Sequence, residues 1–255
     1  MGARSRLGAV ALLAAGLCSV GATAATPKLP DLPESYIFSP SGELTPLRAG
    51  VTYRASQFPQ ALRVTPPSRS WTGAQWKANN FPPDEIKRRH LKCSTSPAVC
   101  RPPYFGWVAI GKGGASPAPA PRALILIMAG YDRTPSVAVT VANLRTRGTG
   151  ATYDPTTTVK VAGFSGTEFD GRLVGPKHVF VPFSPPSHAA GGNSDAIETD
   201  GVGHAFRLIV LNVRGHTVVV FIGSLVMSAD QFATFLPEAD GILKSLRFPR
   251  GANGG

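Results

Sequence analysis

The clearest pattern of apolar and polar positions lies near the C-terminus. Two apolar runs, residues 205–213 and 217–223, are separated by Arg214-Gly215-His216, where glycine supplies the positive φ of a tight turn. Ser228 and Gln231 then form a capping box, and the apolar residues after it recur at three- and four-residue steps. These residues are Phe232, Phe235, Leu236, Ala239, Leu243 and Leu246. The pattern predicts a C-terminal β-hairpin followed by an amphipathic helix with one buried face.

Shorter apolar runs upstream predict the other strands of an antiparallel sheet. Residues 123–128 are entirely apolar, which is typical of a central strand covered on both faces. Residues 134–147 carry apolar positions at helical spacing after Thr134, a candidate N-cap, and predict a further helix. More strands are predicted at residues 50–54, 61–64, 104–110, 159–162, 164–173 and 178–183.

The N-terminus has the pattern of a Sec-type signal peptide. Arg4 and Arg6 precede an apolar run, residues 7–20, that is too short to span a bilayer. Small residues around Ala24 and Ala25 then supply a cleavage site. We therefore expect residues 1–25 to be removed and the mature protein to be secreted or associated with the cell envelope.

Cys18 raises lipoprotein processing as an alternative. A lipoprotein signal has a small residue before the acylated cysteine, and Leu17 occupies that position, so the sequence disfavours lipid attachment. No later apolar run is long enough for a membrane helix. We expect no transmembrane segment after processing.

The rest of the chain is expected to contain one domain. Residues 26–46 are rich in proline and predict an extended segment. Residues 47–248 have the length and the apolar content of a single α/β domain, and residues 249–255 are expected to form a disordered tail.

The two remaining cysteines, Cys93 and Cys100, predict a disulfide bond. They are close in sequence, even in number and expected to reach an oxidising compartment. A redox pair needs closer cysteines, and a zinc site needs two further ligands. The disulfide is therefore the favoured interpretation.

The terminal block also resembles a known group of proteins. Residues 206–215, 235–239 and 245–248 resemble the C-terminal signature of small, uncharacterised secreted proteins of actinobacteria. That family also has a Gly-x-Tyr segment and a Val-x-Gly-x-x-Gly-x-x-x-Asp strand pair, to which residues 50–53 and 161–170 correspond with a slight offset. Its layout is similar to the PsbP/Mog1-like α/β/α sandwich. The resemblance implies an α+β fold, an antiparallel β-sheet flanked by helices, and a binding or assembly role.

Two short motifs resemble catalytic signatures without meeting their requirements. Residues 106–112 spell GxxxxGK, but Gly113 follows where a phosphate loop has Ser or Thr, and no helix comes next. Ser165 lies between glycines at 163 and 166, which is not the spacing of a nucleophile elbow. We interpret this second segment as a tight connection between strands.

The predicted loop 184–204 carries the best candidate metal ligands. Carboxylates and imidazoles suit a divalent cation, although their spacing here matches no named site, and a solvated loop would have the same composition. The candidate ligands are His188, Asp195, Glu198, Asp200 and His204.

A basic patch offers a different kind of site. Lys87, Arg88, Arg89 and Lys92 lie close in sequence to several aromatic residues, as in a groove that binds polyanions. A solvated helix face has the same appearance and is the more ordinary interpretation. The formal charge of +11 favours encounter with an anionic surface or a cell-envelope polymer, and we do not expect nucleic acid as the partner.

These features favour an exported, non-catalytic binding or envelope-associated protein whose ligand the sequence does not identify. We expect no cofactor. One alternative is a hydrolase or metal-dependent enzyme that uses loop 184–204. Another is a polyanion-binding module that uses residues 87–92.

Overall fold

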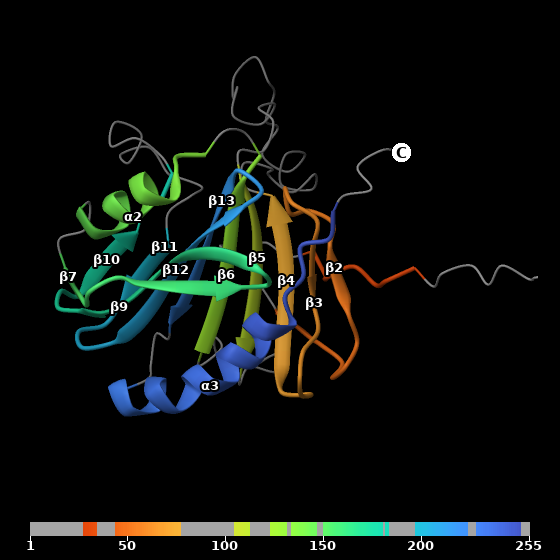
Figure 1. The fold of residues 1–255 in the computed structure, drawn as a ribbon. Helices are drawn as coiled ribbons and strands as arrows, with labels where there is room; N and C mark the ends of the chain where they lie inside the picture. The colour runs from red at the N-terminus through yellow and green to blue at the C-terminus, as the bar shows by residue number, and fades with distance from the viewer. Residues whose placement is uncertain are drawn as a thin grey trace, which may run out of the picture.

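The computed structural model describes residues 28–34, 44–77, 105–112, 123–131, 134–146, 150–180, 182–183, 197–223 and 228–250. Its centre is a nine-stranded antiparallel sheet with the order β1-β4-β5-β6-β13-β12-β9-β7, in which β8 also pairs with β9 (Figure 1). The strands are β1 (Thr45–Pro46), β4 (Trp71–Lys77), β5 (Phe105–Lys112), β6 (Ala123–Gly130), β7 (Ala151–Tyr153), β8 (Thr157–Val161), β9 (Phe164–Leu173), β12 (Ala205–Val213) and β13 (His216–Gly223).

Both faces of this sheet are covered. One face carries α2 (Val137–Thr146) with the two-stranded sheet of β10 (Lys177–Phe180) and β11 (Ile197–Asp200). The other carries α3 (Ala229–Ser245) and a ribbon of β2 (Tyr53–Ala55) and β3 (Leu62–Val64). In β12, Leu208 packs into the core on the α2 side and Ile209 into the core on the α3 side. The predicted α+β architecture with an antiparallel sheet flanked by helices is confirmed.

The C-terminal hairpin and helix form as the sequence predicts. Arg214 and Gly215 both have positive φ, 55° and 88°, so a two-residue turn joins β12 to β13. At the start of α3, the Ser228 hydroxyl accepts a hydrogen bond from the Gln231 N–H at 3.3 Å. The Gln231 side chain accepts one from the Ser228 N–H at 3.0 Å, which completes the capping box.

Two local expectations were wrong. The helix predicted after Thr134 begins at Val137, and the Thr134 hydroxyl instead accepts a hydrogen bond from the Thr217 N–H of β13 at 3.0 Å. Part of the predicted loop 184–204 is strand β11, because the side chain of Ile197 is buried and the backbone pairs with β10. In both cases a distant part of the chain determines the local structure.

Residues 28–34, here called the N-terminal strap, join the β2–β3 ribbon to β4. The Leu32 N–H donates to the Arg54 carbonyl of β2 at 2.8 Å, and the Gln75 N–H of β4 donates to the Pro33 carbonyl at 2.9 Å. The buried Gln75 side chain also donates to the Leu32 carbonyl, at 2.6 Å. Leu32 itself is 1% exposed and belongs to the core. The strap therefore fixes the position of the ribbon relative to the large sheet.

Among the helices in the described ranges, none combines the length and the apolar character needed to cross a membrane. This finding concerns only those residues.

The strap predicts that Leu32→Ala destabilises the fold. Truncating a buried leucine costs about 2 to 5 kcal/mol of unfolding free energy, measured by urea denaturation of the mature protein. The matched control is Val174→Ala, because Val174 is 56% exposed and its truncation should cost less than about 0.5 kcal/mol. Equal, small changes in the two variants would show that the strap is only a surface tether.

Candidate functional site

Most of the predicted site residues lie outside the described residues. The cysteine pair is Cys93 and Cys100, and the basic patch is Lys87, Arg88, Arg89 and Lys92. The two metal-ligand candidates are His188 and Asp195, and the signal segment 1–25 also lies outside the described residues. Glu198 and Asp200 lie in β11, and His204 lies just before β12. Within the described ranges, no group of three or more His, Cys, Asp or Glu residues could hold a metal ion. The metal site in loop 184–204 stays a prediction.

The two motifs that resemble catalytic signatures lie in regular structure. Residues 106–112 belong to β5, where Lys112 contacts the Glu238 carboxylate and lies 5.7 Å from the centre of the Trp71 ring. Ala162 and Gly163 form the turn between β8 and β9, and Ser165 is a residue of β9. Neither segment forms the loop that its motif would need.

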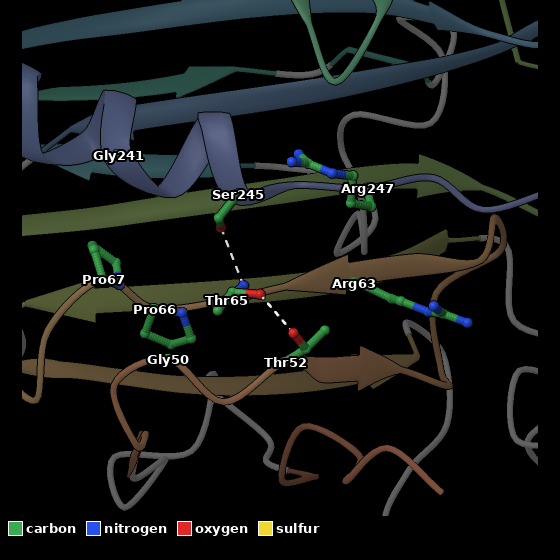
Figure 2. Close-up of a pocket in the computed structure, with 9 residues that line it drawn as sticks. All are labelled: Gly50, Thr52, Arg63, Thr65, Pro66, Pro67, Gly241, Ser245 and Arg247. Carbon is green, nitrogen blue, oxygen red and sulfur yellow. Dashed lines mark hydrogen bonds between the residues drawn. The ribbon is translucent and has the colours of Figure 1, made fainter. Parts of the chain in front are cut away.

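An open groove of about 560 Å³ lies between the outer side of the β2–β3 ribbon and the C-terminal end of α3 (Figure 2). Its lining residues come from three separate stretches of the chain. They are Gly50, Thr52, Arg63, Thr65, Pro66, Pro67, Gly241, Ser245 and Arg247. The groove is therefore a product of tertiary packing.

The alternation of β3 places its polar residues in this groove. Leu62 and Val64 are fully buried, so Arg63 and Thr65 face outward. Arg247 lies in the extended segment after α3, between the buried residues Leu246 and Phe248, so it also faces outward. The same two-residue period thus sets the direction of both arginines.

Arg63 and Arg247 are paired through their backbones. The Arg63 N–H donates to the Arg247 carbonyl at 2.9 Å, and the Arg247 N–H donates to the Arg63 carbonyl at 3.0 Å. On the other side of β3, Arg63 is directly opposite Arg54. Three arginines therefore stand next to one another across the ribbon, an arrangement that like-charge repulsion destabilises.

Only one of these three arginines is neutralised within the described part of the chain. Arg54 makes a bidentate pair with Asp31 of the strap, at 2.7 and 3.0 Å. Neither Arg63 nor Arg247 has a carboxylate within 4.0 Å there. Among the described residues, the groove thus carries two positive charges without a carboxylate partner.

Hydroxyl groups connect the two sides of the groove. The Thr65 N–H donates to the Ser245 hydroxyl at 3.1 Å, and that hydroxyl donates to the Ile242 carbonyl at 2.7 Å. The hydroxyl oxygens of Thr52 and Thr65 lie 2.8 Å apart, so one of their two hydrogens joins them. The other hydrogen is available to a ligand.

The two guanidinium groups point away from each other (Figure 2). Arg247 turns toward the end of α3, where its Nη1 atom donates to the Lys244 and Leu246 carbonyls, both at 2.7 Å. A positive charge at this position also stabilises the C-terminal end of the helix dipole. Within the described residues, the guanidinium of Arg63 forms no hydrogen bond.

The chemistry of the lining suits binding of an anion. Guanidinium groups and a free hydroxyl hydrogen are donors that recognise oxyanions. Among the described residues, the nine that line the groove include no His, Cys, Asp or Glu that could act as a general base or strong nucleophile.

A second charged cluster lies on β9 and β12, and its members satisfy one another. Arg207 pairs with Asp170 in bidentate fashion, at 2.7 and 2.9 Å, and lies 3.5 Å from Glu168. Burial raises the pKa of the Glu168 carboxyl, Arg207 opposes this effect, and Asp170 and Asp240 add to it. Arg207, the only cation of this cluster among the described residues, is already paired with Asp170, so we interpret the cluster as structural.

A buried polar contact joins α2 to β7 and β10. The Tyr153 hydroxyl donates to the Leu144 carbonyl at 2.8 Å and lies 3.3 Å from Nε2 of the buried His178. Burial raises the pKa of Tyr153 to about 12, so the phenol stays neutral at physiological pH. This contact also has a structural role.

Sequence reasoning missed Arg63 and Arg247, although both carry the same local signal. Each arginine stands between two large apolar residues, in Leu62-Arg63-Val64 and Leu246-Arg247-Phe248. That pattern predicts an outward arginine on an extended segment. What it does not show is that the two segments pair with each other.

The raised pKa of Glu168 predicts a pH-dependent effect of Glu168→Gln. Because the pKa of Glu168 is raised in the folded state, its carboxyl contributes fully to stability below the ordinary pKa of 4.5. This contribution is lost as pH rises. The unfolding free energy of the variant should therefore increase relative to wild type between about pH 4 and about pH 7.

Asp31→Asn should show the opposite trend and serves as the control. The hydrogen bond from Arg54 lowers the pKa of Asp31, so its contribution is present above the ordinary value of 3.8 and is lost on acidification. Denaturation curves from about pH 2 to about pH 7 measure both effects, because the Asp31 contribution is lost mainly below its ordinary pKa of 3.8. The same slope in both variants would contradict the assignment.

Comparisons with known proteins found a structural similarity only. No protein-family model and no curated protein matches the chain. Among solved structures, the chain is similar to cyanobacterial PsbP (CyanoP) from Synechocystis sp. PCC 6803, with 10% identity over 80% of this chain and 94% of that chain and a TM-score of 0.40. At that TM-score the similarity assigns neither a family nor a ligand.

Proposed function

We propose that the mature chain is an exported, non-catalytic binding protein that holds an anionic ligand in the groove between the β2–β3 ribbon and α3. The observation that carries this proposal is the pairing of Arg63 with Arg247 without a neighbouring carboxylate in the described residues. An arrangement of like charges costs stability, and an anion that binds between or beside them removes that cost.

Three other cations on the same side of the sheet are paired with carboxylates. Arg54 is bound by Asp31, Arg207 by Asp170, and Lys112 by Glu238. These three side chains are neutralised by carboxylates, whereas Arg63 and Arg247, like Lys244 at the end of α3, have no carboxylate partner among the described residues.

The absence of acid–base groups from the lining supports binding over catalysis. Hydrolysis of a bound ester or glycoside requires a nucleophile or a base in reach of the substrate. The hydroxyls of Thr65 and Ser245 are engaged in the hydrogen bonds that join the two sides of the groove, and among the described residues no imidazole or carboxylate lines it to activate them.

The formal charge of the chain favours partners of opposite sign. Removal of Arg4 and Arg6 with the signal segment lowers the formal charge from +11 to +9, and the mature protein still attracts anionic surfaces over the distance that salt screening permits. Together with the expected export, this charge supports a cell-envelope polymer or an anionic surface as the ligand.

The proposal predicts that the groove arginines contribute to binding of an anionic polymer. Binding of labelled dextran sulfate to the mature protein, measured by fluorescence anisotropy, should weaken about three- to fivefold in Arg63→Gln and in Arg247→Gln, as expected for exposed ion pairs. Binding should also weaken as salt is added.

Arg172→Gln is the matched control, because Arg172 is an exposed residue of β9 and its substitution removes the same charge. It should leave the affinity within about twofold of wild type, since an unpaired surface charge contributes little. Equal loss in all three variants would show that only net charge matters and would contradict a site in the groove.

A further inference from the structure

We infer that the ligand of the groove is a linear anion with at least two phosphate groups, one bound by Arg63 and the other by Arg247. This inference rests on the proposed anion-binding function and adds the valency and the chemical class of the ligand.

The opposite directions of the two arginine side chains determine how many anionic groups the ligand needs. Although Arg63 and Arg247 are backbone partners, their guanidinium groups point in opposite directions (Figure 2). Arg247 would have to give up its hydrogen bonds to the Lys244 and Leu246 carbonyls in order to turn toward Arg63. A single small anion therefore satisfies one arginine and leaves the other unneutralised.

The free edges of the guanidinium groups suit oxyanions. Arg54 and Arg207 both bind a carboxylate through Nε and Nη2, which shows how arginine pairs with an oxyanion in this protein. In Arg247 only Nη1 is engaged, so the same Nε and Nη2 edge is open. Arg63 has the whole group open among the described residues. Each arginine can thus hold one oxyanion group in bidentate fashion.

The surface between the arginines can accommodate a chain of oxyanion groups, of which phosphate is the class proposed here. The remaining lining consists of Gly50, Gly241, Pro66, Pro67 and hydroxyl side chains, without an acidic residue that would repel a passing anion. A phosphate in a linear polymer keeps unbridged oxygens for a guanidinium while the chain continues through its bridging oxygens. The free hydroxyl hydrogen of the Thr52–Thr65 pair can donate to such an oxygen.

The same lining disfavours recognition of nucleic acid. Proteins that bind single strands stack the bases on aromatic rings, and none of the nine lining residues is aromatic. The groove can contact a charged backbone but provides no platform for bases. A polymer whose repeats lack bases therefore fits better.

Calorimetric titration of the mature protein at low salt tests the valency. Tripolyphosphate should bind about tenfold more tightly than orthophosphate, because a second bidentate contact is added. In Arg63→Gln and in Arg247→Gln this preference should fall to about threefold or less, while the affinity for orthophosphate changes little and its stoichiometry falls by half, since each arginine holds one anion. Arg172→Gln should keep the full preference.

Two further titrations test the location and the polymer class. A variant with Lys87, Arg88, Arg89 and Lys92 all changed to Gln should keep the preference for tripolyphosphate, and its loss there would move the site to the basic patch. Long-chain polyphosphate and a polyglycerol phosphate chain distinguish a phosphoanhydride from a phosphodiester source. A thymidine oligonucleotide that binds more tightly than both would overturn the inference.

The outcomes also separate this inference from the proposed function. If orthophosphate binds as tightly as tripolyphosphate and both depend on the two arginines, the groove is a single-anion site and only the valency is wrong. If dextran sulfate depends on the arginines but no phosphate compound binds, the phosphate class is wrong. If neither depends on the arginines, the proposed function fails as well.

Discussion

Two backbone hydrogen bonds between Arg63 and Arg247 connect the end of the chain to the β2–β3 ribbon. They are reinforced by the bond from Thr65 to Ser245, residues that are 180 positions apart in sequence. The apolar neighbours of both arginines are buried in the core that α3 covers, so the arginines have no direction available except outward. The groove, its charge and its donors all follow from this pairing.

The strap and the capping box support the pairing from opposite sides. Leu32 and Gln75 hold the ribbon against the large sheet through buried contacts. The capping box fixes where α3 begins, and its buried stripe from Phe232 to Leu243 fixes how the helix lies on the sheet. The position of Ser245, and of the chain that follows it, is therefore determined by packing that extends across this face of the molecule.

Sequence reasoning predicted the elements whose signals are local. The turn at Gly215, the capping box at Ser228 and the helix stripe each depend on residues close together in the chain, and each was recovered. Thr134 and Ile197 were misread because their partners, Thr217 and Phe180, lie elsewhere in the fold. Arg63 and Arg247 were missed for the same physical reason, since register between distant segments leaves no local trace.

The proposed role of the groove depends on repulsion between Arg63 and Arg247 in the free protein. A double-mutant cycle with Arg63→Gln and Arg247→Gln, followed by urea denaturation at low salt, measures their coupling directly. Repulsion between the two arginines predicts an unfavourable coupling of about 0.2 to 1 kcal/mol that disappears at high salt. A coupling that is zero or favourable at low salt would contradict it.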